Sequence, residues 1–154
     1  MFGKDCVMGS EKEKKVLKIV GIVIIVVAIV SAGYGISVVQ RGKRAALLMS
    51  SDPAYQKSLS ALISSGIGMV VSALFNLAEG VSSFLASKNS RFAGPAWVCS
   101  LLSLLSNGIS GVSSIIRTGF SVGALSGLIL SVGLALQVYV AAGKLKSNYK
   151  SAMS

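Results

Sequence analysis

The sequence contains no histidine, and only five of its 154 residues are Asp or Glu. Histidine is the commonest general base and the commonest metal ligand, so its absence weighs against acid–base catalysis and against a zinc site. The two cysteines, Cys6 and Cys99, lie in a charged and an apolar segment, without the spacing of a disulfide framework or a metal site. No nucleophile has a base beside it. We therefore expect a protein that is not an enzyme, without catalytic residues, metal or cofactor.

Charged residues of both signs are scarce as well. They make up 13% of the chain, whereas hydrophobic residues make up 53% and the mean hydropathy is +0.75. A soluble domain usually has about 25% charged residues. The apolar residues are collected in blocks long enough to cross a bilayer core of about 30 Å. We therefore predict one compact domain embedded in a lipid bilayer.

The charged residues that are present are mostly basic, with 15 Lys and Arg against 5 Asp and Glu and a net charge of +10. Nucleic acid is one partner that such a balance allows. The basic residues lie, however, in short tails and loops beside apolar blocks, as in membrane proteins that contact anionic lipid headgroups. This distribution predicts the bilayer and anionic headgroups as partners, and no nucleic acid.

Four apolar blocks predict transmembrane helices, because a run of this length in lipid forms a helix even where β-branched residues are frequent. Pro95 suits the first turn of a helix, and Trp97 suits the headgroup region. The predicted fold is an all-α integral membrane bundle of four transmembrane helices with short loops and Gly/Ser-rich interfaces. The predicted helices are about 16–39, 58–86, 95–116 and 120–142, in a transmembrane domain 16–142 between basic tails 1–15 and 143–154.

The first block allows a second interpretation. Val30-Ser31-Ala32 before Gly33 is similar to a signal-peptide cleavage site. The apolar stretch is longer than the usual 7–15 residues and continues to Val39, which favours a retained anchor.

Four spans place both ends of the chain on one side of the membrane. Ten basic residues fall on that side and five on the other, so the positive-inside rule predicts a multi-pass cell-membrane protein with both termini in the cytoplasm. The ten are Lys4, Lys12, Lys14, Lys15, Lys18, Lys88, Arg91, Lys144, Lys146 and Lys150, and the five are Arg41, Lys43, Arg44, Lys57 and Arg117.

Small residues at helical spacing predict close helix packing, because lipid provides no hydrophobic drive between helices and small side chains let backbones approach. Gly119, Gly123 and Gly127 recur every four residues in the fourth helix and predict a contact within the bundle or between copies. The alternative for such faces is a polar pathway through the bundle.

An internal repeat is a further possibility. Ser72–Leu85 and Ser103–Ile116 agree at seven of fourteen aligned positions, including Asn76 with Asn107. Because the two helices run in opposite directions, common ancestry would make this an inverted repeat of the kind found in transporters. Chance agreement in a Gly- and Ser-rich chain is the alternative.

Glu79 is the only acidic residue within the four predicted spans. Residues at a similar depth complete a candidate intramembrane polar site of Asn76, Glu79, Ser103, Asn107 and Gln137. A protonated Glu79 that donates to Asn or Ser would tether helices. A Glu79 that changes protonation would be a proton or cation site, as intramembrane acids often are. A side chain that reaches the headgroups or water is the third possibility.

The pattern resembles that of small uncharacterised four-helix bacterial membrane proteins. The likeness rests on Lys14-Lys15, Asn76, Gly80, Gly94-Pro95-Ala96 and Lys144-Leu145-Lys146. It spans most of the chain and implies a fold without an activity. Rotary-ATPase proteolipids also combine four helices, spaced glycines and one Glu, but here Glu79 lies in the second helix and the glycines in the fourth.

Three functions remain after these exclusions. The first is a non-enzymatic membrane scaffold or accessory subunit that packs through Gly/Ser faces, as a homo-oligomer or against a larger membrane partner. The second is a proton- or cation-coupled transporter or channel with Glu79 as the ion site. The third is a lysis-type pore former, although the helices carry few charges with which to line a wide aqueous hole.

Overall fold

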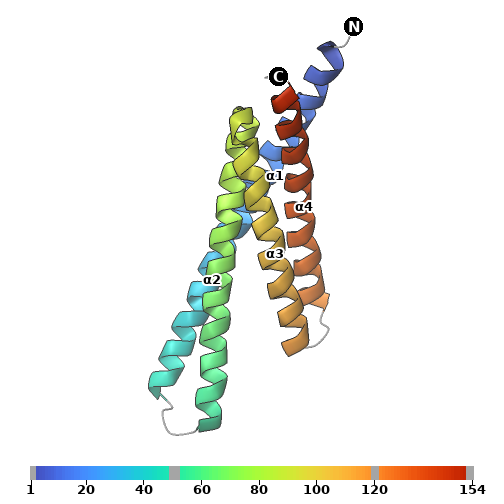
Figure 1. Cartoon of the computed structure of the whole chain (residues 1–154). Coiled ribbons are helices and arrows are strands. Elements are labelled where there is room, and N and C mark those ends of the chain that lie inside the picture. Colours follow the sequence, from blue (N-terminus) through green and yellow to red (C-terminus); the bar gives the residue numbers. More distant parts are fainter. Residues whose placement is uncertain (1–2, 49–52, 119–121, 152–154) are drawn as a thin grey trace. The chain divides into compact units, whose positions relative to one another are not determined.

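The computed structural model describes residues 3–48, 53–118 and 122–151, which are helical except at Asn89. The elements are α1 (Gly3–Leu48), α2 (Pro53–Lys88), η1 (Ser90–Phe92), α3 (Ala93–Thr118) and α4 (Val122–Ser151) (Figure 1). All four α-helices contain segments long and apolar enough to cross a membrane, at Glu11–Leu47, Tyr55–Lys88, Ser90–Val112 and Leu125–Ser151. The predictions of an all-α fold and of four such helices are confirmed.

The helices are longer than the predicted spans. Residues 40–57, the loop between the first two predicted helices, are helical to Leu48 and again from Pro53. Residues 49–52 lie outside the described part. The predicted tails are also largely helical, since α1 begins at Gly3 and α4 ends at Ser151. The physical reason is that hydropathy marks the apolar part of a helix, whereas Lys, Arg, Ala and Leu continue a helix readily beyond it.

The connection between α2 and α3 is short. The Asn89 backbone N–H donates to the Leu85 carbonyl at 2.9 Å, and the Arg91 N–H donates to Asn89 Oδ1 at 3.1 Å. Asn89 is therefore the N-cap of η1. Because η1 leads directly into α3, these helices are antiparallel neighbours.

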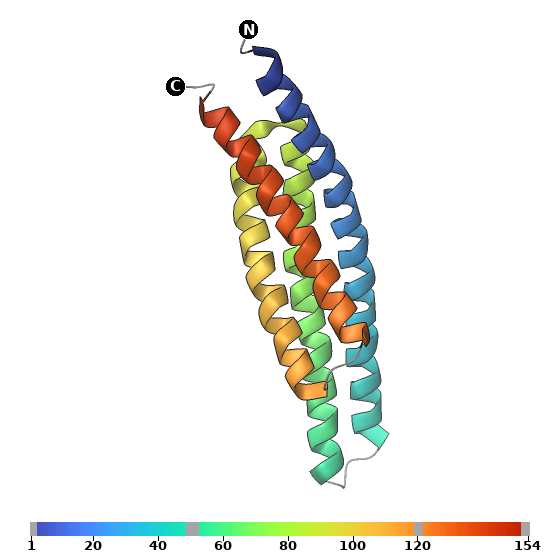
Figure 2. The ribbon, with the colours of Figure 1, turned by 90° about the vertical axis from the view of Figure 1, so that its right-hand side faces the viewer.

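The chain divides into two compact units, which we describe separately. Unit 1 comprises residues 1–25 and 75–154. The beginning of α1, the end of α2, the beginning of α3 and the end of α4 lie at one end of this unit (Figures 1 and 2). Its apolar core consists mainly of small and medium side chains, namely Leu17, Val20, Ile24, Ala86, Ala93, Ala96, Val138, Ala141, Ala142 and Leu145.

Within unit 1, α1 and α2 approach so closely that glycine is required at the contact. A Cβ atom on Gly21 would lie 3.0 Å from the Gly80 carbonyl oxygen, and one on Gly80 would lie 2.9 Å from the Gly21 oxygen. Real Cβ atoms rarely come this close to backbone atoms. The two helices therefore pack backbone to backbone, as helices in lipid often do.

Unit 2, residues 26–74, consists of the remaining halves of α1 and α2 and repeats this contact. A Cβ on Gly35 would lie 3.0 Å from the Gly66 oxygen, and the reverse distance is also 3.0 Å. Buried Ala28 and Ala73 lie one heptad away from these glycines. The buried small residues thus recur every seven positions, at 21, 28, 35 and 42 in α1 and at 66, 73 and 80 in α2. A seven-residue repeat is typical of a left-handed supercoil.

The outward faces of the helices are apolar in both units. In unit 2, Val30 is 67% exposed and Tyr34 63% exposed, and in unit 1 Ile109 is 71% exposed. Contact between such a surface and water would be unfavourable, at about 25 cal/mol for each Å² of apolar area.

Candidate functional site

Three polar side chains of unit 1 form a closed hydrogen-bonded group between α2 and α3. The Ser103 hydroxyl donates to Asn76 Oδ1 at 2.8 Å. The Asn107 amide donates to the same Asn76 oxygen at 3.0 Å and to Ser103 Oγ at 3.2 Å. The structure thus brings together three of the five residues of the predicted polar site in one contact.

The sequence places these residues by helical spacing. Ser103 and Asn107 are four residues apart in α3, and Asn76, Glu79 and Ser83 follow at steps of three and four in α2, so each set shares a face. The short connection at Asn89 then sets these two faces against each other at the same height.

Glu79, the fourth predicted residue, is 1% exposed, and its neighbours in the sequence are bonded to its backbone. Ser82 and Ser83 donate to the Glu79 carbonyl oxygen at 3.0 and 2.7 Å. The side-chain carboxyl lies within hydrogen-bonding reach of the Ser103 hydroxyl, while Oε1 is buried without a partner in the described part of the chain.

The number of donors and acceptors around Glu79 indicates which protonation state of its carboxyl fits this arrangement. Ser103 has one proton, which it donates to Asn76, so toward Glu79 it can only accept. A neutral Glu79 acid can donate to Ser103, whereas a carboxylate would require Ser103 to turn away from Asn76. No cation compensates a charge, since the helix segments 19–40, 58–87, 92–116 and 122–143 contain no Lys or Arg.

Gln137, the fifth predicted residue, is exposed and takes no part in this group. The buried positions of α4 are Ala135, Val138, Ala141, Ala142 and Leu145, which define a different face of the helix. Depth along the helix suggested Gln137, but α4 is apolar on all sides, so its packed face cannot be read from hydropathy.

The predicted glycine contact of α4 remains a prediction, and the close glycine contacts in the described residues lie elsewhere. Gly119 and the surroundings of Gly123 lie outside the described residues, and a Cβ on exposed Gly127 would meet nothing within 4 Å. The closely packed glycines include Gly21, Gly35, Gly66 and Gly80 in α1 and α2, and Gly111 in α3, where a Cβ would collide with Leu128 of α4. The seven-residue spacing of Gly66, Ala73 and Gly80 was the signal for the α2 contact.

The two segments of the suggested internal repeat both contribute to unit 1. The aligned residues Asn76 and Asn107 contact each other, since the Asn107 amide donates to Asn76 Oδ1. Of the aligned glycines, Gly80 packs against α1 and Gly111 against α4. The aligned pair Glu79 and Ser110 differs, since Glu79 is buried and Ser110 exposed.

The donor set at Glu79 limits what the group can hold. Among the described residues, no three His, Cys, Asp or Glu side chains come together. A cation at Glu79 would therefore be coordinated by one carboxylate together with amide and hydroxyl oxygens, which are ligands for hard cations. A proton needs only the carboxyl.

Comparison of the chain with protein-family models, with curated proteins and with solved structures finds no match. The functional argument therefore rests on the geometry above.

Proposed function

We propose that the chain is a multi-pass membrane protein of four spans with both termini in the cytoplasm, acting as a non-enzymatic scaffold or accessory subunit. The exposed apolar faces of all four helices support the embedding, because lipid is the environment in which such faces are stable. The ten-to-five excess of basic residues supports the orientation.

The observation that carries the packing role is the contrast between two sets of glycines. The first set makes close contacts within the chain and consists of Gly21, Gly35, Gly66 and Gly80. Exposed Gly33, Gly68 and Gly127 have open space where a Cβ would be. In lipid, exposed glycines allow a second helix to approach the backbone, so these positions suit a further copy or a larger membrane partner.

The size of the particle in lipid nanodiscs tests this role. Gly127→Leu should reduce the mass of the assembly, because the larger side chain prevents a close approach at α4. Gly68→Leu tests the equally open position of α2 in the same way. A monomeric wild type that also copurifies with no membrane protein would contradict the proposal.

A second function, a proton or cation site at Glu79, is favoured by the unpaired Oε1 atom. A helix tether has no use for a buried oxygen without a hydrogen-bond donor. A site that binds and releases an ion needs such an oxygen as the ligand. Glu79→Gln distinguishes the two, since Gln keeps the size and hydrogen-bonding groups but never ionises. Folded Glu79→Gln protein that loses an ion flux present in wild-type liposomes would establish the ion site.

A further inference from the structure

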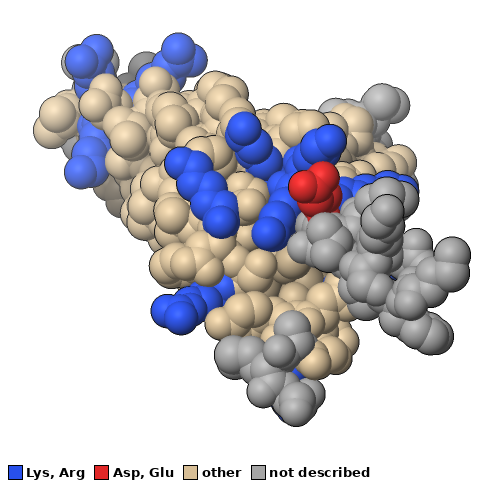
Figure 3. Space-filling model, turned by 90° about the horizontal axis from the view of Figure 1, so that it is seen from above, with Lys and Arg blue, Asp and Glu red and all other residues tan. Residues whose placement is uncertain are grey.

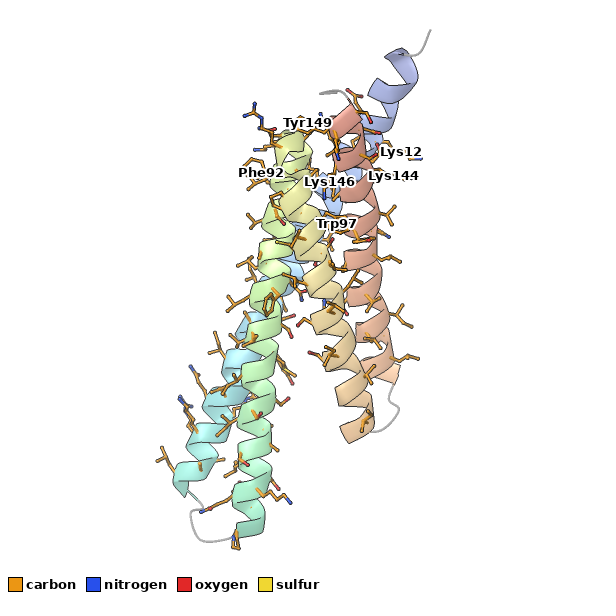
Figure 4. All side chains as sticks on the ribbon, in the orientation of Figure 1. Lys12, Phe92, Trp97, Lys144, Lys146 and Tyr149 are labelled. Carbon is orange, nitrogen blue, oxygen red and sulfur yellow. The ribbon has the colours of Figure 1, made fainter. Side chains whose placement is uncertain are left out.

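Basic side chains and an aromatic pair lie at the end of unit 1 where α1 begins and α4 ends. Figure 4 places Lys12 of α1, Trp97 of α3, and Lys144 and Lys146 of α4 at this end. All three lysines are exposed. Viewed onto this end, basic side chains make up most of the charged surface, with acidic surface among them (Figure 3). We call Lys12, Trp97, Lys144 and Lys146 the cationic end cluster.

Trp97 fixes the position of one of these cations. The Lys146 Nζ atom lies 4.7 Å from the centroid of the Trp97 ring, a cation–π contact, and the Trp97 ring lies 5.3 Å from that of Tyr139. Two aromatic rings with polar edges are typical of the headgroup level of a membrane. In the proposed embedding, Trp97 would hold Lys146 at the depth of lipid phosphates.

Ion pairs within the described part of the chain do not neutralise the lysines of the cluster. In the part of the chain that the structure describes, no carboxylate forms an ion pair with Lys12, Lys144 or Lys146. The acids nearest in sequence to Lys12 are Glu11, which is exposed, and Glu13, whose Oε2 is buried without a partner. An anion supplied from outside would give these lysines their counter-charge.

The apolar surface next to the cluster indicates what kind of anion fits. In α3, Leu101 lies one helical turn from Trp97 and on the same face of the helix. In α4, Leu136 lies one turn from Tyr139, also on the same face. Both leucines are nearer the middle of their helix than the aromatic residue. Leu101 is 38% and Leu136 51% exposed. Cations at one end and an apolar strip below them match an amphiphile whose headgroup is anionic.

We infer that the cationic end cluster binds the phosphate headgroup of an anionic glycerophospholipid, whose acyl chain lies along Leu101 and Leu136. The inference rests on the proposed membrane embedding and adds a specific lipid site to it. Lys146, held on the Trp97 ring, contacts the phosphate. Lys144, on another face of α4, and Lys12 of α1 add two further cations at the same end, and Trp97 lies at the glycerol level.

Trp97 also reports on this site, because it is the only tryptophan of the chain. The experiment measures quenching of Trp97 fluorescence by phosphatidylglycerol with brominated acyl chains, in vesicles of otherwise unlabelled phosphatidylcholine. Brominated phosphatidylcholine at the same mole fraction gives the reference. Preferential quenching by the anionic lipid is the expected result for the wild type.

The double variant Lys144→Gln/Lys146→Gln should weaken the preference by about thirtyfold, from roughly 1 kcal/mol for each cation near the membrane surface and about 1.4 kcal/mol per factor of ten. Arg41→Gln/Lys43→Gln removes the same charge from exposed positions of unit 2 and should leave the preference unchanged. An equal loss in both variants would overturn the site, because net charge alone would then explain the binding.

Two further measurements separate the remaining outcomes. Inorganic phosphate at constant ionic strength should not displace the brominated lipid, and displacement would overturn the assignment to a lipid. Resistance to alkaline extraction from membranes tests the embedding independently. A chain that stays in the membrane but is quenched equally by both lipids refutes the lipid site alone, whereas an extractable chain refutes the proposed function and the site together.

Discussion

The contact between α1 and α2 can be tested with two glycines of α2 that are only two residues apart. A Cβ on Gly66 would lie 2.7 Å from Val39 Cγ2, 3.0 Å from the Gly35 oxygen and 3.1 Å from the Val39 nitrogen. A Cβ on Gly68 would meet nothing within 4 Å. Gly66→Ala and Gly68→Ala therefore add the same methyl group to the same helix in opposite environments.

The expected magnitudes follow from two effects. Replacing Gly by Ala inside a helix stabilises it by about 1 kcal/mol, and this gain is common to both variants. Overpacking at Gly66 costs about 1–3 kcal/mol, because two of the three atoms in the way belong to the backbone and cannot rotate aside. The difference between the two variants is thus the steric term alone, about 1–3 kcal/mol in favour of Gly68→Ala.

Thermal unfolding in a mild detergent measures this difference. For a chain of this size about 1 kcal/mol corresponds to about 2–4 °C in Tm, so Gly66→Ala should melt roughly 2–12 °C below Gly68→Ala. Equal melting temperatures would refute the close contact between α1 and α2. A lower melting temperature for Gly68→Ala would show that its face is packed instead.

Three further outcomes are expected. Asn76→Ala removes the acceptor of two hydrogen bonds and should destabilise the protein by about 1–2 kcal/mol in the same unfolding assay, while Gln137→Ala, at an exposed position, should have little effect. Gly127→Leu should not lower the Tm of monomeric protein, because its site within the chain is open, and a lowered Tm of the monomer would place it in a contact within the chain. Single cysteines introduced at residues 49–52, in Cys-free protein, should react with an impermeant reagent from outside the cell, and labelling from the cytoplasmic side alone would reverse the topology.

The sequence predicts the class of the fold well, but only some of the contacts between the helices. Length and hydropathy suffice for four helices, because each apolar block must satisfy its backbone internally. They do not predict that α1 continues to Leu48, since helix formation does not require apolar residues. The contact between Asn76, Ser103 and Asn107 could be predicted, because polar side chains on apolar helices form hydrogen bonds with one another. The turn at Asn89 fixes the register of the two helices.

Contacts made by small or apolar residues are harder to predict, for a physical reason. Gly66 and Gly68 are identical in hydropathy, yet one touches α1 and the other faces outward. Only the heptad phase separates them, and it becomes visible when both helices are read together. The same ambiguity explains Gln137, because α4 offers apolar residues on every side and depth alone does not select a face.

The hydrogen bonds between α2 and α3 bear on the role of Glu79. Asn76, Ser103 and Asn107 already join α2 to α3, so a carboxyl is not needed for that purpose. Ser110, which aligns with Glu79 in the suggested repeat, is exposed, so such a repeat would not require a buried acid at this position either. A neutral Glu79 that donates to Ser103 still leaves Oε1 buried without a donor, and an unsatisfied acceptor costs about 1–3 kcal/mol. A cation that binds Oε1 after Glu79 has released its proton would supply the missing partner, which is the reasoning behind the proposed ion site.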